Sequence, residues 1–204
     1  MATHWRRKRF HIKPEFAFWA LIAHLVGVSA YFTYEVEVRR RNLKGVGNAA
    51  KLASGAIVKP VKAIDGDEVS VKTGGTPTVI RILGIKSFSA TANERTIQSV
   101  GAAAWREADK LMRADPGPLI VTYKTYKQDK RGRTLAYLER GKIDIGLRLV
   151  EKGLVLVFTR YPFSRQTTYL AAEAKARAQE LGLWGDPKTT LRALALKAVW
   201  EANQ

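Results

Sequence analysis

The chain has 204 residues, of which 46% are hydrophobic, and this composition excludes both a multi-domain enzyme and an intrinsically disordered protein. Because cysteine is absent, there is no disulfide, thiolate metal site or cysteine nucleophile. The 35 Lys and Arg against 18 Asp and Glu give a formal net charge of +17, which predicts an anionic partner, either nucleic-acid phosphate or lipid headgroups.

The positive charge is concentrated at the N-terminus. Residues 1–59 hold 11 Lys and Arg against 3 Glu, whereas the much longer segment 60–185 holds 21 against 13. The two segments therefore carry the same excess. Within the first segment, basic residues form blocks at 6–13 and 39–44, on either side of an apolar run.

The apolar run extends from Phe16 to Tyr34. As a helix it would be about 28 Å long, close to the roughly 30 Å hydrocarbon thickness of a bilayer. Aromatic residues stand near both of its ends, as they do in membrane helices. We therefore predict a basic flank at 1–13, a transmembrane helix at 14–38 and a linker at 39–56. A buried amphipathic helix and a cleaved signal peptide are the alternatives.

Short strand patterns follow the linker. They cover residues 57–64, 68–72, 78–85, 119–126 and 134–138. Helical spacing covers 95–112, 143–152 and 169–181. Five short strands with an interrupting helix and closing helices predict an α+β fold, an OB-fold five-stranded β-barrel with packed helices, over a domain at 57–186.

A C-terminal helix is predicted within 187–204. Its apolar positions Leu191, Leu194, Ala195, Ala198 and Val199 share one face, and Trp200 lies beside them. The barrel does not require this helix, so we expect it to dock either onto the domain or onto a partner.

Five motifs occur in the domain in a fixed order. They are IDGDEV at 64–69, IRILGI at 80–85, DKRGRTLAY at 129–137, LVEKGL at 149–154 and AEAKARAQELGLW at 172–184. In this order and spacing they resemble the staphylococcal nuclease family, over residues 57–186. The resemblance implies an OB-fold barrel, in agreement with the strand pattern.

The resemblance also implies a set of site residues. The family uses two aspartates on Ca²⁺, two arginines on phosphate and a glutamate that acts on water. Carried over by position, Asp67 is the first aspartate, and Arg81 and Arg133 are the arginines. The second aspartate and the glutamate belong to a D-[TS]-P-E segment, which here reads Lys86-Ser87-Phe88-Ser89.

Lys86 and Ser89 thus replace two carboxylates. An ammonium group at Lys86 repels a dication, and Ser89 removes a general base, a loss that typically costs about 10²–10⁴-fold in rate. We therefore predict no catalytic residue, no metal ligand set and no cofactor, with Glu94 left open as a replacement carboxylate.

Four basic residues are predicted to bind anions: Arg81, Arg133, Lys130 and Arg131. The alternative is structural, with Asp67 serving the turn and Arg81 forming a salt bridge with it.

These features predict a catalytically inactive, nuclease-like, membrane-anchored accessory or scaffolding subunit of a membrane protein complex. Its partners would be the lipid bilayer and other subunits, contacted through the transmembrane and C-terminal helices. The arrangement resembles membrane-anchored nuclease-like proteins of mitochondria, which implies the inner membrane and the respiratory chain, with a bacterial inner membrane as the alternative. Alternative functions are a membrane-tethered metal-dependent nuclease and single-stranded nucleic-acid binding through the basic loop 124–133.

Overall fold

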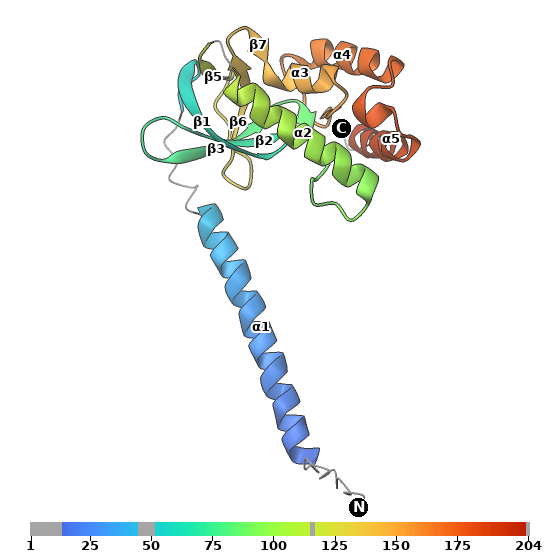
Figure 1. The fold of residues 1–204 in the computed structure, drawn as a ribbon. Helices are drawn as coiled ribbons and strands as arrows, with labels where there is room; N and C mark the ends of the chain where they lie inside the picture. The colour runs from blue at the N-terminus through green and yellow to red at the C-terminus, as the bar shows by residue number, and fades with distance from the viewer. Residues whose placement is uncertain (1–13, 45–51, 115–116, 203–204) are drawn as a thin grey trace, which may run out of the picture. The chain divides into compact units, whose positions relative to one another are not determined.

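The computed structural model describes residues 14–44, 52–114 and 117–202, in two compact units that divide after Gly45 (Figure 1). The predicted basic flank at 1–13 and part of the predicted linker, 45–51, lie outside the described residues.

The first unit is the helix α1, Pro14–Lys44. Proline is suited to the first turn of a helix, where no backbone N–H is needed. The helix continues past the predicted end at 38 because the residues that follow are mostly Arg, Leu and Lys, which favour helix. All side chains from Phe18 to Tyr34 are exposed. Within the part of the chain that the structure describes, no helix is both long and apolar enough to cross a membrane, so the predicted transmembrane helix is not confirmed.

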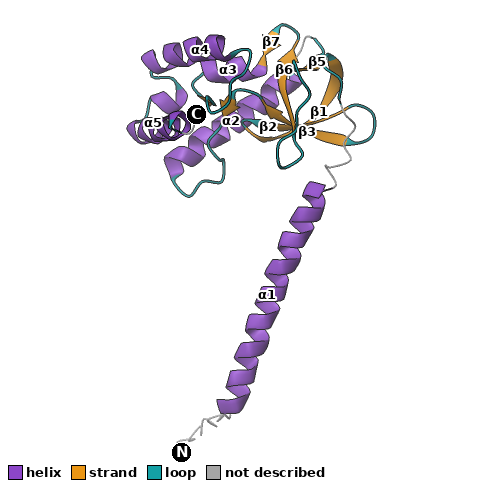
Figure 2. Cartoon of the chain, turned by 180° about the vertical axis from the view of Figure 1, so that it is seen from behind, coloured by secondary structure: helices purple, strands orange, loops and turns teal. Residues whose placement is uncertain are grey.

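The second unit is built on a β-barrel. Its strands are β1 (Ala56–Asp65), β2 (Glu68–Lys72), β3 (Pro77–Ile82), β5 (Leu119–Thr122) and β6 (Thr134–Arg140). β1, β2 and β3 form an antiparallel meander, β5 pairs with the other edge of β1, and β6 joins β5 to β3. The parallel pairing of β6 with β3 closes the sheet (Figure 2). This topology confirms the predicted α+β fold with an OB barrel.

β6 changes partner along its length. Residues 134–136 pair with β3, and residues 137–140 pair with β5. β5 therefore ends at Thr122, before the predicted end at 126, because its neighbour has moved to β3. Tyr123 instead leaves the sheet, where its N–H donates to Ser54 Oγ and its hydroxyl donates to the Leu52 carbonyl.

The predicted third strand, 78–85, is divided in the structure. β3 ends at Ile82, and β4 (Ile85–Lys86) pairs with β8 (Leu156–Val157) as a separate two-stranded sheet. Gly84 makes the turn between β3 and β4 with φ of +77°, and the Phe163 ring packs against its Cα. A side chain at this position would be strained and would clash with that ring.

Helices cover the barrel as predicted, with small differences in their ends. They are α2 (Arg95–Arg113), α3 (Ile145–Glu151) and α4 (Gln166–Ala178). α3 is preceded by the two-residue strand β7 (Ile143–Asp144), which pairs with the end of β6. The Asp144 carboxylate caps α3 by accepting from the Leu147 N–H at 3.0 Å, so the helix begins after β7.

The C-terminal helix α5 (Pro187–Glu201) docks onto the domain beyond the short 3₁₀ helix η1 (Gly182–Trp184). The Trp200 ring packs edge-on against Phe158 with ring centroids 4.8 Å apart. Lys197 forms an ion pair with the buried Glu173 of α4. The helix therefore packs against a second hydrophobic core beside the barrel.

The predicted apolar face of α5 is not the buried face. Leu191 and Val199 are exposed, whereas Ala193 and Trp200 are buried. The reason is that Lys197 lies on the same side of α5 as Ala193 and Trp200, and its pairing with Glu173 turns this side inward. Hydrophobicity along the helix alone does not reveal that ion pair.

The packing of α5 predicts a large effect of Trp200→Ala. Removing the buried indole should lower the free energy of unfolding by about 3 kcal/mol, because it leaves a cavity against Phe158. Leu191→Ala, at a position 68% exposed on the same helix, is the control and should change it by less than about 0.5 kcal/mol. Urea unfolding of the full chain measures both values, and equal effects would contradict this packing.

Candidate functional site

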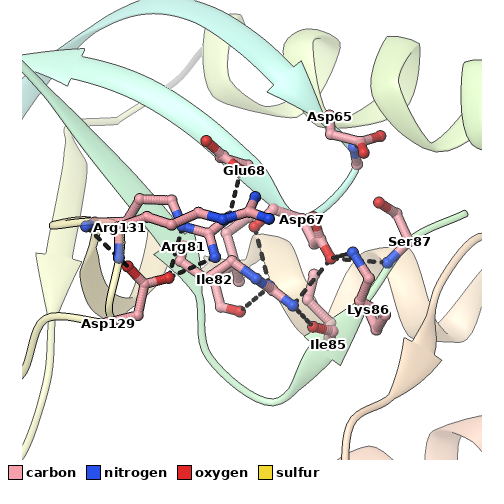
Figure 3. A network of polar contacts seen from close by, with 12 residues as sticks. Asp65, Asp67, Glu68, Arg81, Ile82, Ile85, Lys86, Ser87, Asp129 and Arg131 are labelled. Carbon is pink, nitrogen blue, oxygen red and sulfur yellow. Dashed lines mark hydrogen bonds and ion pairs between the residues drawn. The ribbon is translucent and has the colours of Figure 1, made fainter. Parts of the chain in front are cut away.

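Three segments converge at one end of the barrel (Figure 3). They are the turn 65–67 between β1 and β2, the segment 81–87 that contains the end of β3 and β4, and the turn 129–133 before β6. The antiparallel register of β2 and β3 places Glu68 opposite Arg81. The parallel pairing of β3 with β6 brings Arg133 to the same place. The structure thus brings Asp67, Arg81, Lys86 and Arg133 to one place.

Glycine at position 66 allows this convergence. A Cβ there would lie 2.5 Å from the Ala104 Cβ of α2 and 2.9 Å from the Ser87 Cβ. The turn 65–67 can therefore enter between α2 and the segment after β4 only if it has no side chain at its centre. The close approach buries Asp67, which follows in the chain.

Asp67 is 2% exposed, and its Oδ2 atom accepts two hydrogen bonds and forms an ion pair with Arg81. Lys86 Nζ and the Ser87 N–H each lie 3.0 Å away, and Arg81 Nη2 lies 2.9 Å away. Burial by itself raises the pKa of this carboxyl, but the charges of Arg81 and Lys86 and the Ser87 hydrogen bond outweigh it, so the pKa lies below its ordinary value. Asp67 is therefore a buried, ionised carboxylate whose Oδ2 atom contacts two cationic groups and one N–H group.

Arg81 connects Asp67 to the neighbouring backbone. Its guanidinium donates to the carbonyls of Asp67, Ile82 and Ile85 at 3.1, 2.8 and 2.6 Å. Burial lowers the pKa of Arg81 while the Asp67 charge opposes this change, and the guanidinium stays charged. The side chain is 11% exposed, so Arg81 acts in this structure mainly as an internal brace.

Arg133 has two carboxylate partners of its own. Its Nη1 atom lies 2.5 Å from Glu68 Oε2, and its Nε atom lies 2.7 Å from Asp129 Oδ2. Asp129 also accepts from the N–H groups of Arg131 and Arg133, which fixes the turn.

Neither carboxylate partner of Arg133 was predicted. The Asp129-x-x-Gly132 turn signature could have identified Asp129. Glu68 gave no local signal, because its pairing depends on strand register.

The side chains of the remaining predicted site residues lie outside these contacts. Lys130 and Arg131 are exposed in the turn 129–133. The Ser89 hydroxyl forms a local hydrogen bond with Thr91, and Glu94 accepts from the Thr96 hydroxyl. Across the described ranges, no group of three or more His, Cys, Asp or Glu residues is arranged to hold a metal ion, with or without Glu94.

We call six of these residues the ion-pair cluster: Asp67, Glu68, Arg81, Lys86, Asp129 and Arg133. It contains three carboxylates and three cationic groups joined by salt bridges. An incoming phosphate would compete with these carboxylates for Arg81 and Arg133. Anion binding by Arg81, Arg133, Lys130 and Arg131 stays a prediction.

A closed OB barrel with Asp67, Arg81 and Arg133 gathered at one end defines a nuclease-like OB domain. The family model described as staphylococcal nuclease homologue matches residues 79–186, more than half of the chain, and the chain belongs to this family. The matched range contains both arginines and begins after Asp67.

Individual relatives agree with this assignment. The thermonuclease of Staphylococcus intermedius is 27% identical over 125 residues, which cover 60% of this chain and 73% of the relative. The thermonuclease of Staphylococcus hyicus is 25% identical over 130 residues, or 63% of this chain and 75% of the relative. An uncharacterized endonuclease of Haemophilus influenzae is 26% identical over 129 residues, or 62% and 65% of the two chains.

The residues present at the site do not fit the divalent cation that the family implies. A cation bound at Asp67 Oδ2 would meet the Lys86 ammonium, which lies 3.0 Å from that oxygen, and the Arg81 guanidinium at 2.9 Å. Calcium and magnesium require several oxygen ligands, and here three nitrogen atoms already contact Oδ2 of Asp67. Binding would have to overcome repulsion from two positive charges.

The geometry predicts that Asp67 is important for stability. Asp67→Ala leaves Arg81 and Lys86 without their shared carboxylate and should lower the free energy of unfolding by about 3 kcal/mol. Glu151→Ala removes an exposed ion pair with Arg148 and should change it by less than about 0.5 kcal/mol. Chemical denaturation of both variants tests this, and a small effect of Asp67→Ala would show that the ion-pair cluster does not stabilise the fold.

Proposed function

We propose that this protein carries a nuclease-like domain that does not cleave nucleic acid by the mechanism of its family and that it acts as an accessory or scaffolding subunit. The observation that carries the proposal is the contact of Asp67 with Lys86. At this site, the carboxylate that would take a metal ion is neutralised by a lysine of the same chain.

The chemistry of phosphodiester cleavage supports this proposal. Metal-dependent cleavage needs oxygen ligands for the cation, positive groups directed at the phosphate and a base for the attacking water. Nitrogen atoms contact Oδ2 of Asp67, and Arg81 and Arg133 each form ion pairs with carboxylates of the domain. Ser89, at the position of the base, has a hydroxyl in place of a carboxylate.

A nuclease assay tests the loss of activity. Full-length protein should show no Ca²⁺-dependent cleavage of single-stranded DNA, because the site neither binds the metal nor supplies a base for the attacking water. Arg133→Ala should leave this background unchanged. Cleavage that requires Ca²⁺ and disappears in Arg133→Ala would instead establish the alternative, a metal-dependent nuclease.

An accessory role in a membrane complex is the second part of the proposal. It is supported by the apolar run 16–34, between basic blocks in the sequence, and by the exposure of every side chain from Phe18 to Tyr34 along α1. Aromatic and aliphatic side chains in such a continuous exposed series favour a lipid or protein environment over water. The assignments to the mitochondrial inner membrane, the respiratory chain or a bacterial inner membrane stay predictions from the sequence.

Size analysis of the native protein tests this role. After solubilisation in a mild detergent, the protein should migrate with other subunits in a complex much larger than its own 22.7 kDa plus a micelle. Repeating the analysis with Leu191→Ser, which makes an exposed site on α5 polar, tests whether this helix contributes to assembly. Migration of the wild-type protein as a single chain in its micelle would contradict a stable complex.

A further inference from the structure

Lys86 is fixed at the ion-pair cluster by its backbone. Its strand β4 pairs with β8, with Lys86 opposite Leu156. The Phe158 N–H donates to the Gly84 carbonyl at 2.9 Å and extends this attachment beyond β8. These backbone hydrogen bonds hold the Lys86 Cα in place, and the extended side chain reaches Asp67.

The Lys86 side chain approaches Asp67 from the solvent side. It is 44% exposed, whereas the Asp67 side chain is 2% exposed. The ammonium thus covers a carboxylate whose other contacts, with Arg81 and the Ser87 N–H, come from within the protein. A long side chain with a compact terminal charge suits this place, because its methylene groups pack while the charge remains partly hydrated.

Burial raises the pKa of Asp65, at the start of the same turn, and the charge of Lys86 opposes this change. Asp65 and Asp67, with Gly66 between them, repel each other. In this chain Lys86 contacts Asp67 and is the more exposed member of that ion pair.

We infer that Lys86 is a built-in cation that takes the structural place of the divalent metal and joins the turn 65–67 to β4. The domain is therefore fully stable without metal and does not bind one at Asp67. This inference deepens the proposed function, on which it rests for the identity of the site, and it makes a separate claim about stability and metal binding.

Thermal unfolding of the full chain in detergent tests the inference, with each sample measured in EDTA and in millimolar CaCl₂. The wild-type Tm should be the same in both. Lys86→Met should lower Tm by about 5 °C in both conditions, because Asp67 loses one of its two cationic partners.

Lys152→Met is the matched control. The Lys152 side chain is 45% exposed and forms a salt bridge with Glu107 at 2.7 Å, but it does not cover a buried aspartate. Its loss should lower Tm by less than about 2 °C. Equal shifts for Lys86→Met and Lys152→Met would overturn the structural role of Lys86.

Lys86→Asp tests the metal position directly. It adds a third carboxylate beside Asp65 and Asp67, so it should lower Tm in EDTA and regain at least half of the loss in CaCl₂, since calcium favours such oxygen ligands. Failure of calcium to raise its Tm would overturn the assignment of Lys86 to the metal position. If this variant does not fold, the other two samples decide the question. An equal wild-type Tm in EDTA and CaCl₂, with a lowered Tm of Lys86→Met in both, would support the assignment. A rise of the wild-type Tm in CaCl₂ would overturn it.

The two proposals can fail separately. A rise of the wild-type Tm in CaCl₂ without DNA cleavage would overturn the built-in cation and leave the proposed function intact. Migration of the wild type as a single chain in its micelle, with no calcium effect on Tm, would overturn the proposed accessory role and support the inference.

Discussion

The site of this protein depends on one buried charge, the carboxylate of Asp67. An ionised carboxylate taken out of water is costly unless charged and hydrogen-bonding partners surround it. Here the partners come from β3, β4 and the residue after β4: Arg81, Lys86 and the Ser87 N–H. Satisfying this one carboxylate therefore fixes the turn 65–67 against the end of β3 and against β4. The same contacts place two cationic groups and one N–H group at Asp67 Oδ2, where they hold the turn in place.

The topology of the barrel explains why positive and negative charges balance in the ion-pair cluster. β6 crosses from β5 to β3, so the turn before it brings Arg133 and Asp129 to the side where β2 presents Glu68. Three carboxylates and three cations then offset one another, and the net charge of +17 does not reside in the ion-pair cluster. Much of the positive excess belongs to the N-terminal segment and to exposed loops such as 124–131. A basic sequence in a nuclease-like family is therefore not by itself evidence of a working phosphate site.

The chain also adds structure beyond the matched family range, which ends at residue 186. α5 completes a second core in which Trp200 contacts Phe158 and Lys197 neutralises Glu173. Glu173 in turn accepts from the Val157 N–H of β8, the strand that pairs with β4. A continuous series of contacts thus links α5 through β8 to the strand that carries Lys86. We regard α5 as part of the domain, with its exposed side at Leu191 and Val199 left for other contacts.

The sequence by itself determined the barrel strands, the main helices and the replacement of two family carboxylates by Lys86 and Ser89. These features are local, since they follow from alternation, helical spacing and residue type within short segments. Only the tertiary structure decided that Lys86 contacts Asp67, that Glu68 and Asp129 hold Arg133, and that α5 buries the side with Lys197. Each of these depends on strand register or helix docking, which brings together side chains that no local pattern connects. The sequence thus identified Lys86 and Ser89 as replacements of family carboxylates. The folded chain decided that Lys86 is an ion-pair partner of Asp67, the carboxylate that is retained.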